Sequence, residues 1–410
     1  MIGLILSLLI ILGISVFIIV YVFNYKPNRK GKVKDLYAEG LDLLVSGKRK
    51  VAYQNFKEII NKDSNNIKAY LRLGQVLRES NNPKQALKIH QRLLHRKKLN
   101  FHDTIDLHKN LALDYFFDDN YLKAIKELEI IIKMDKMNEW AINYLVKVHC
   151  KIQDWHNASQ YLQKYQKIIN TVDNHKLGLY KIQEGRILIR KEMFSESRKK
   201  FEDALMICND LAAAYYFIGN SYSAESEVAY QKSIDQKKNL NLEGDDVAGN
   251  ALDDASLLLE KAIPMWIRYA DLKPKQAWMV IYLLKDALFA LDRYSEFENI
   301  LKQIIINDKN NIEVIASLSE ILSHRGEDME ALELIESAID QAPTSLLIKL
   351  MHLKHQAKKE KGSSENMRSL DDIIHFLVRD ERFQIYKDTN TDPDILWLYE
   401  TSADDVSIES

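Results

Sequence analysis

Small residues recur along most of this chain at intervals close to 34 residues, in the middle of every second predicted helix. Their positions, counting one glutamate that interrupts the series, are Ala52, Ala86, Ala124, Ala158, Ser197, Ala262, Glu296 and Ala331. The spacings are 34, 38, 34, 39, 65, 34 and 35 residues. Two helices and their turns fill one such interval, so the pattern predicts an all-α solenoid of stacked antiparallel helix pairs.

Other positions of the repeat hold small and large side chains in a fixed order. Small residues such as Gly40 and Gly74 stand in the first helix, and large residues such as Phe56 and His90 follow the central alanine of the second helix by four positions. Antiparallel helices approach closely only where no bulky side chain separates them. The order resembles tetratricopeptide repeats. About eight of them are predicted over residues 36–343.

One interval of the repeat is longer than the others. The 65 residues between Ser197 and Ala262 equal one repeat of 34 plus about 31 inserted residues. This stretch is rich in residues that favour turns: Asn239, Asn241, Gly244, Asp245, Asp246, Gly249 and Asn250. The sequence therefore predicts an inserted polar loop at about 225–254, and a dedicated partner-binding element is the alternative.

The start of the chain is strongly apolar. Ile2 to Phe23 are 22 consecutive residues without a charge, which is enough for a helix to cross a bilayer. We expect a transmembrane anchor at 1–24 and a basic juxtamembrane segment at 25–35. The positive residues follow the apolar run, so the positive-inside rule predicts a single-pass protein with its N-terminus outside and the repeats in the cytoplasm.

The end of the chain departs from the repeat pattern. Residues 344–382 are predicted to form a helical cap followed by a linker. The acidic tail at 383–410 carries seven Asp and Glu residues from Asp388 onward and no Lys or Arg, with Trp397 as its one large anchor.

Composition excludes several classes of protein. The 57 Lys and Arg against 59 Asp and Glu give a net charge of −2, which lacks the basic footprint of a nucleic-acid binder. The two cysteines, Cys150 and Cys208, cannot build a disulfide framework or a cysteine metal site. The sequence has no phosphate-binding glycine loop, nucleophile elbow or zinc-protease motif, so we expect no enzyme, no catalytic residues and no cofactor.

Histidines are the remaining candidates for metal binding. The pair His352 and His355 lies on one helical face, and His102 and His108 are near each other in sequence, but neither pair has a third nearby ligand. We therefore expect no metal site. His90 occupies a packing position of its repeat and is predicted to be a core residue.

Solenoids of this kind bind ligands through the concave surface lined by the first helix of each repeat. The polar residues predicted to face this groove are Gln75, Arg78, Lys109, Asn143, Lys147, Lys151, Arg186 and Arg190. They are mainly basic, which favours an acidic peptide or chain terminus as the ligand. Ordinary solvated helix faces are the alternative interpretation.

Several local motifs resemble the LapB (YciM) family of lipopolysaccharide assembly proteins. They are Tyr37-Ala38-Glu39-Gly40-Leu41, Leu73-Gly74 with Leu77-Arg78, Ala86-Leu87 with Ile89-His90-Gln91, Asp114-Tyr115 and Gln153-Asp154-Trp155. The resemblance implies an inner-membrane adaptor, without enzymatic activity, that promotes degradation of the deacetylase LpxC by the membrane protease FtsH and contacts other lipopolysaccharide assembly proteins. A general scaffold that gathers envelope-assembly enzymes without directing proteolysis is the alternative, and the chain could form a homodimer.

The sequence departs from that family at its C-terminal end, where members carry two C-x-x-C knuckles of a rubredoxin-like metal module. Here Ile385 and Asp388, then Tyr399 and Ser402, stand at a similar spacing without any thiol. These residues cannot supply a tetrahedral thiolate site. The resemblance then implies at most a degenerate, metal-free remnant at 383–410.

Overall fold

The computed structural model describes residues 14–15, 29–96, 99–240, 246–309, 311–342, 345–359, 368, 370–371, 373–374 and 391–401. Every regular element in these ranges is a helix. The chain divides into two compact units, Met1–Ile152 and Gln153–Ser410, which are described separately below.

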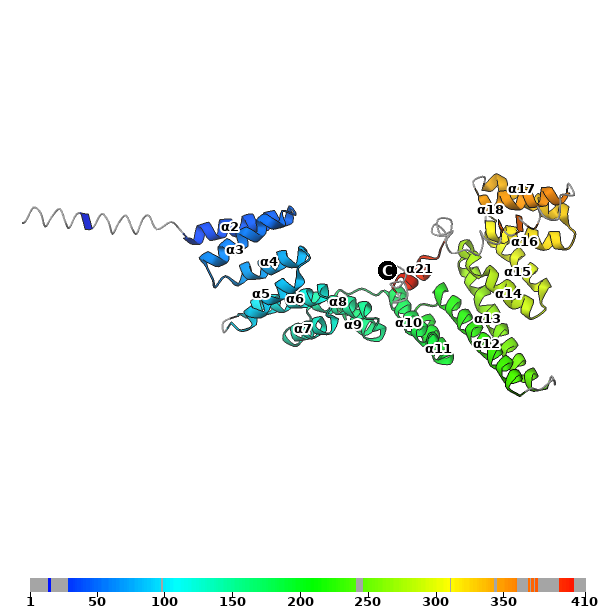
Figure 1. Cartoon of the computed structure of the whole chain (residues 1–410), viewed down its shortest axis with the longest axis horizontal. Coiled ribbons are helices and arrows are strands. Elements are labelled where there is room, and N and C mark those ends of the chain that lie inside the picture. The colour runs from blue at the N-terminus through cyan, green and yellow to red at the C-terminus, as the bar shows by residue number, and fades with distance from the viewer. Residues whose placement is uncertain are drawn as a thin grey trace, which may run out of the picture. The chain divides into compact units, whose positions relative to one another are not determined.

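The first unit consists of helices packed in successive pairs, α2 with α3, α4 with α5 and α6 with α7 (Figure 1). Its helices are α2 (Arg29–Val45), α3 (Arg49–Lys62), α4 (Ile67–Glu79), α5 (Pro83–Leu94), α6 (Phe101–Phe117), α7 (Tyr121–Met134) and α8 (Glu139–Lys151). This arrangement agrees with the predicted helix-pair repeat.

The second unit continues the same pairing. Its helices are α9 (Trp155–Ile168), α10 (Asn174–Ile189), α11 (Phe194–Ile207), α12 (Ala212–Leu240), α13 (Asp246–Leu272), α14 (Trp278–Ala290), α15 (Tyr294–Asn307), α16 (Ile312–His324), α17 (Asp328–Gln341), α18 (Leu346–Lys359) and α21 (Pro393–Glu400), with a 3₁₀ turn at Pro274–Gln276. Helix α18 packs on α16 and α17.

Several first helices of the pairs begin at an Asn or Asp residue. The side chains of these cap residues accept a hydrogen bond, 2.7–3.2 Å long, from the backbone N–H three positions later. Such a bond satisfies a donor that has no partner inside the helix, which is why these residue types start helices. The capping residues are Asn66, Asn100, Asn138, Asp173 and Asn311.

Glycines in the first helices make room for large side chains from the second helices. A Cβ atom added to Gly74 would lie 2.2 Å from Nε2 of His90, and one added to Gly219 would lie 2.4 Å from Nε1 of Trp266. Gly40 and Gly185 meet Phe56 and Phe201 in the same way. The predicted close approach of the paired helices is therefore confirmed, as is the buried packing position of His90, which is 0% exposed.

The predicted inserted loop at 225–254 is wrong for the residues that the structure describes, 225–240 and 246–254. Residues 225–240 lie in α12 and residues 246–254 in α13, two helices of 29 and 27 residues, whereas the others have at most 17. No Gly or Pro occurs between Asn220 and Leu240, so no strong helix breaker interrupts this part of α12. The inserted residues therefore lengthen both helices of one pair, and Ser226 Oγ donates to Ala255 O across it at 2.8 Å.

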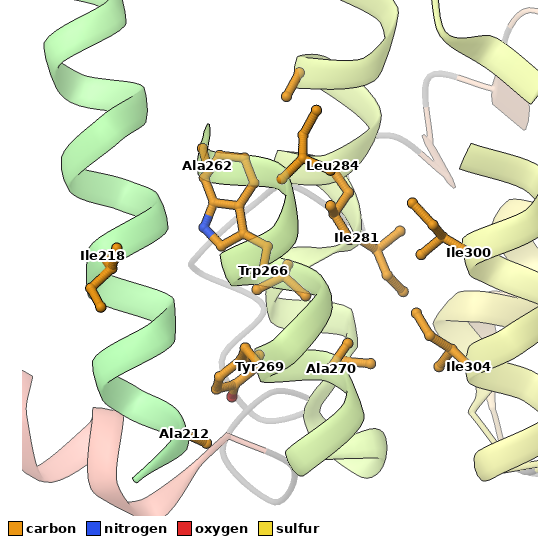
Figure 2. Close-up of a cluster of buried hydrophobic side chains, with 14 of the residues drawn as sticks. Ala212, Ile218, Ala262, Trp266, Tyr269, Ala270, Ile281, Leu284, Ile300 and Ile304 are labelled. Carbon is orange, nitrogen blue, oxygen red and sulfur yellow. The ribbon is translucent and has the colours of Figure 1, made fainter. Parts of the chain in front are cut away.

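The largest core of the second unit lies where α12 to α15 meet. Figure 2 shows Trp266 and Tyr269 of α13 together with Ile218 of α12 and Ile281 of α14 in this layer. The indole N–H of Trp266 donates to Asn220 Oδ1 at 3.0 Å, so its one polar group is satisfied.

No helix in the described ranges is long and apolar enough to cross a membrane. The predicted anchor at 1–24 lies outside the described residues except for Ile14 and Ser15, and the basic segment at 25–35 is described only from Arg29, where α2 begins. Of the tail at 383–410, residues 391–401 are described, and they contain helix α21.

Candidate functional site

The first unit contains a cavity of about 420 Å³ on the side formed by its first helices. One lining residue comes from α2, five from α4, four from α6 and one from α8, so successive repeats each contribute to it. The lining residues are Tyr37, Lys68, Leu71, Arg72, Gln75, Arg78, Asp106, Lys109, Asn110, Leu113 and Trp140. Three of the predicted groove residues, Gln75, Arg78 and Lys109, are brought together here.

Cationic groups dominate the lining of this cavity. Arg72 donates from Nη1 to Gln75 Oε1 at 2.6 Å, which fixes its guanidinium beside the cavity. The ammonium of Lys109 lies 5.5 Å from the ring centroid of Trp140, within the range of a cation–π contact. Lys68 adds a third cation, and Asp106 is the one acid among the lining residues.

Arg78 has a different role from the other cations because its charge is paired internally. Its Nη1 donates to Asp114 Oδ1 at 2.6 Å, and the Arg78 side chain is only 6% exposed. The second oxygen, Asp114 Oδ2, is 2.5 Å from His90 Nδ1, while His90 Nε2 lies 3.2 Å from Leu71 O. Both ring nitrogens of His90 therefore lie within hydrogen-bond distance of an oxygen atom.

The buried cluster of Arg78, Asp114 and His90 links three helices of two repeats, α4, α5 and α6. Arg78 was predicted to hold a partner. It does line the cavity, but its guanidinium is bound to Asp114, and we therefore interpret it first as a structural residue that keeps α4 and α6 in register.

A second hollow of about 430 Å³ adjoins Lys109 and Trp140 and includes the predicted residue Asn143. Trp140 stacks on Tyr144 with ring centroids 5.0 Å apart, and Phe116 meets Tyr144 edge-on at 5.4 Å. Burial raises the pKa of Tyr144, while Arg78 lowers it by a smaller amount.

The remaining predicted groove residues of the first unit lie further along α8. Lys147 is exposed with its ammonium 5.7 Å from the Tyr144 ring centroid, and Lys151 is exposed at the end of the helix. Neither lines the two hollows described above.

Arg186 and Arg190 belong to the second unit. Arg186 donates to the backbone carbonyl of Leu398 in α21, so the structure places the chain's own C-terminal segment on this predicted groove residue. Arg190 is exposed and follows the last residue of α10.

The predicted groove residues do not include Tyr37, Lys68, Arg72 and Asp106, which also line the cavity. Lys68 and Arg72 precede Gln75 by seven and three positions, and Asp106 precedes Lys109 by three. Residues at these spacings share one face of a helix, so the periodicity of α4 and α6 could have identified them.

Among the described residues, no group of three His, Cys, Asp or Glu could hold a metal ion. His108 pairs with Glu127, with Nδ1 2.6 Å from Oε2, and His355 is buried. Burial and a hydrogen bond to Asp210 raise the pKa of the Cys208 thiol to about 11, so this thiol stays protonated at neutral pH.

Comparison with known proteins gives a partial likeness. No family model matches the chain. Lipopolysaccharide assembly protein B of Escherichia coli (strain K12) is 20% identical over 143 residues, which are 35% of this chain and 37% of that protein. The protein of the same name from Escherichia coli O157:H7 matches to the same extent. The match thus spans little more than a third of these relatives.

Solved structures are also similar to the chain in part. A crystal structure of MamA protein covers 43% of this chain and 92% of its own, with 21% identity and a TM-score of 0.32. The C-terminal part of a TPR repeat-containing protein from Cytophaga hutchinsonii covers 68% of this chain and 98% of its own, with 16% identity and a TM-score of 0.35. The chain is thus distantly similar, over about a third of its length, to lipopolysaccharide assembly protein B, and its own helices pack in successive pairs.

Proposed function

We propose that this protein is a tetratricopeptide adaptor whose first unit binds an acidic segment of a partner protein. The observation that supports this most directly is the cavity lined by Lys68, Arg72 and Lys109 with one opposing acid, Asp106. Arg78 does not add to the free cationic charge because Asp114 neutralises it.

The arrangement of charge and aromatic surface suits an acidic peptide with an apolar side chain. Carboxylates of the partner would accept charge-assisted hydrogen bonds from Arg72 and Lys109. Trp140 is partly exposed beside Lys109 and offers a flat apolar surface to the neighbouring side chain. Aromatic and arginine side chains of this kind contribute most of the binding energy in many interfaces.

The binding test uses the full chain and a fluorescent peptide of alternating glutamate and leucine. We expect the double charge reversal Arg72→Glu with Lys109→Glu to weaken binding at least tenfold, and binding by the unaltered protein to weaken as salt is raised. The matched control, Lys84→Glu with Lys88→Glu, changes the same net charge at exposed residues of α5 outside the cavity lining. Equal binding by the double reversal and the control would remove the proposal.

Arg78 is unsuitable for this test. Reversing its charge would place two carboxylates against each other in a buried site, and the solenoid itself would be destabilised. Arg72 tests the groove without that complication because it is exposed.

We further infer that the adaptor acts in lipopolysaccharide assembly at the inner membrane. The partial similarity to lipopolysaccharide assembly protein B supports this, and the uncharged run from Ile2 to Phe23 supports a single-pass anchor with the repeats in the cytoplasm. In this proposal the partners are the membrane protease FtsH and the deacetylase LpxC, and the adaptor promotes degradation of LpxC.

The half-life of LpxC after a translation block, in cells depleted of this protein, tests the proteolytic role. A lengthened half-life is the expected result. An unchanged half-life, with envelope-assembly enzymes still co-purifying with the protein, would instead favour a scaffold that gathers enzymes without directing proteolysis.

A further inference from the structure

Helix α21 is seated on the second unit although it belongs to none of its helix pairs. It begins at Pro393, more than 30 residues after the end of α18, and it contacts α10, which lies some 200 residues earlier in the chain. In Figure 1 it is drawn in red beside the label of α10. Ile395 and Leu398 are both 0% exposed, so the helix is firmly docked.

Aromatic side chains of α21 pack against aromatic rings of α9, α10 and α12. The ring of Trp397 stacks on Tyr180 at a centroid distance of 6.0 Å and an interplanar angle of 13°, and it meets Trp155 edge-on at the same distance. The ring centroid of Tyr399 lies 6.0 Å from that of Phe217.

Polar groups recognise the C-terminal end of α21. Gln183 Nε2 donates to Leu398 O and to Thr401 Oγ1, both at 2.7 Å, and Arg186 also donates to Leu398 O. The Arg186 guanidinium lies 4.4 Å from the ring centroid of Tyr399. These donors satisfy carbonyl groups that have no partner within a helix end.

Carboxylates mark the N-terminal end of the same helix. Asp392 is 0% exposed and caps the helix, accepting from Asp394 N at 2.9 Å. Its other oxygen accepts from Tyr269 Oη at 3.4 Å and lies 3.7 Å from Lys273 Nζ. Asp394 pairs with His175 at 3.0 Å. The acidic residues at the start of α21 are thus contacted by Tyr269, Lys273 and His175 of the helices on which it docks.

The contact of α21 differs from the packing of helix pairs in two respects, although Ile395 and Leu398 join the same buried cluster as the repeats. The helix has eight residues, and a helix this short is unstable in water without a surface to dock on. The positions that contact it on α10, Gln183 and Arg186, are not the glycine and small positions that pack helix pairs. In the second unit α10 pairs with α11, α12 with α13 and α16 with α17, and α21 is a member of none of these pairs.

We propose that this surface of the second unit, formed by Trp155, Tyr180, Gln183, Arg186, Tyr269 and Lys273, is a docking site for short acidic helices. Helix α21 occupies the site in cis. A partner protein binds there through a segment of the same chemistry, an Asp cap followed by a helix with Ile, Trp and Leu on one face, and must first displace α21. This docking site shares no residue with the cavity of the first unit. An experiment can therefore disprove helix docking on the second unit without disproving peptide binding in the cavity, and the reverse also holds.

The test measures binding of a fluorescein-labelled peptide of residues 391–401 to the full chain by anisotropy. The undocked variant carries Ile395→Ser with Leu398→Ser, which removes the two fully buried side chains of α21. A tethered segment competes at an effective concentration of roughly 1 mM. We therefore expect the peptide to bind the undocked variant at least tenfold more tightly than the unaltered chain.

Two controls make the result specific. The same peptide with both serine substitutions should not bind the undocked variant. Adding Arg186→Met and Lys273→Met to the undocked variant should weaken peptide binding at least tenfold, since these side chains meet the two ends of the helix.

Several outcomes would overturn the proposal. One is that the peptide binds the unaltered and the undocked chains with equal affinity. Another is that the peptide does not bind the undocked chain. Loss of helical circular dichroism in the undocked variant would also overturn it, because α21 would then be a necessary part of the fold. A second variant, Asp392→Asn with Asp394→Asn, removes only the carboxylates and should produce a smaller gain in peptide binding.

Discussion

Replacing Asp114 with asparagine is the most direct way to test how the first unit is held together. The substitution keeps the size of the side chain and removes its charge. Both carboxylate oxygens are in use, one by Arg78 at 2.6 Å and the other by His90 at 2.5 Å. The amide of asparagine has only one acceptor oxygen, so its NH₂ group would face a donor on one of these sides.

The burial of the cluster determines the size of the effect. The side chains of Asp114 and His90 are 0% exposed and that of Arg78 is 6% exposed, so solvent cannot screen the charges left behind. Removing one partner of a buried ion pair costs about 3–5 kcal/mol. For a unit of this size each kcal/mol lowers Tm by about 2–4 °C, so we expect a decrease of roughly 6–20 °C.

Thermal and urea unfolding followed by circular dichroism measures this change. Glu129→Gln is the matched control, an acid-to-amide change at an exposed residue of α7, and should alter the free energy of unfolding by less than about 0.5 kcal/mol. If Asp114→Asn unfolds at the same temperature and urea concentration as the control, the buried cluster does not stabilise the unit and our reasoning is refuted.

Two further predictions concern packing and pH. Gly74→Ala should destabilise the protein by about 1–3 kcal/mol, because the new Cβ would lie 2.2 Å from His90 Nε2. The control Gly47→Asn should change stability little, because Gly47 has a positive φ of 73° and no atom lies near the position of its Cβ. Equal melting temperatures of the two variants would contradict the close packing at Gly74. Burial lowers the pKa of His355 from 6.5 to about 4. Between these values the unfolded state binds more protons than the folded state, so stability should fall as the pH drops from about 6.5 towards 4. His355→Gln should flatten that part of the stability profile measured by urea unfolding, and an unchanged slope would show that another group is responsible.

The repeat architecture could be predicted because its signals are local. A glycine in the first helix and a large residue 16 positions later, as in Gly74 with His90 and Gly185 with Phe201, identify two helices that touch. The signals within the insertion were misleading because turn-forming residues such as Asn239, Gly249 and Asn250 lie inside the helices α12 and α13. The long helices on either side contain good helix formers, and those decided the structure of α12 and α13.

The candidate site was predictable only in part. The positions that face the groove in tetratricopeptide repeats led to the prediction of Gln75, Arg78 and Lys109, and these three residues line one cavity in the structure. The repeat pattern could not show that Asp114, on the next repeat, neutralises Arg78, because that contact depends on how α4 packs against α6.

The helix pairs and their order follow from residue types within one repeat, and the acidic character of the tail follows from its composition. Tertiary packing, in contrast, determines which charges remain available for a partner and where residues 391–401 lie. Gln183 and Leu398 are 215 residues apart, and their hydrogen bond exists because Trp397 and Ile395 dock on a surface that earlier repeats assemble. Contacts of that kind depend on the packing of folded helices, and no local pattern records them.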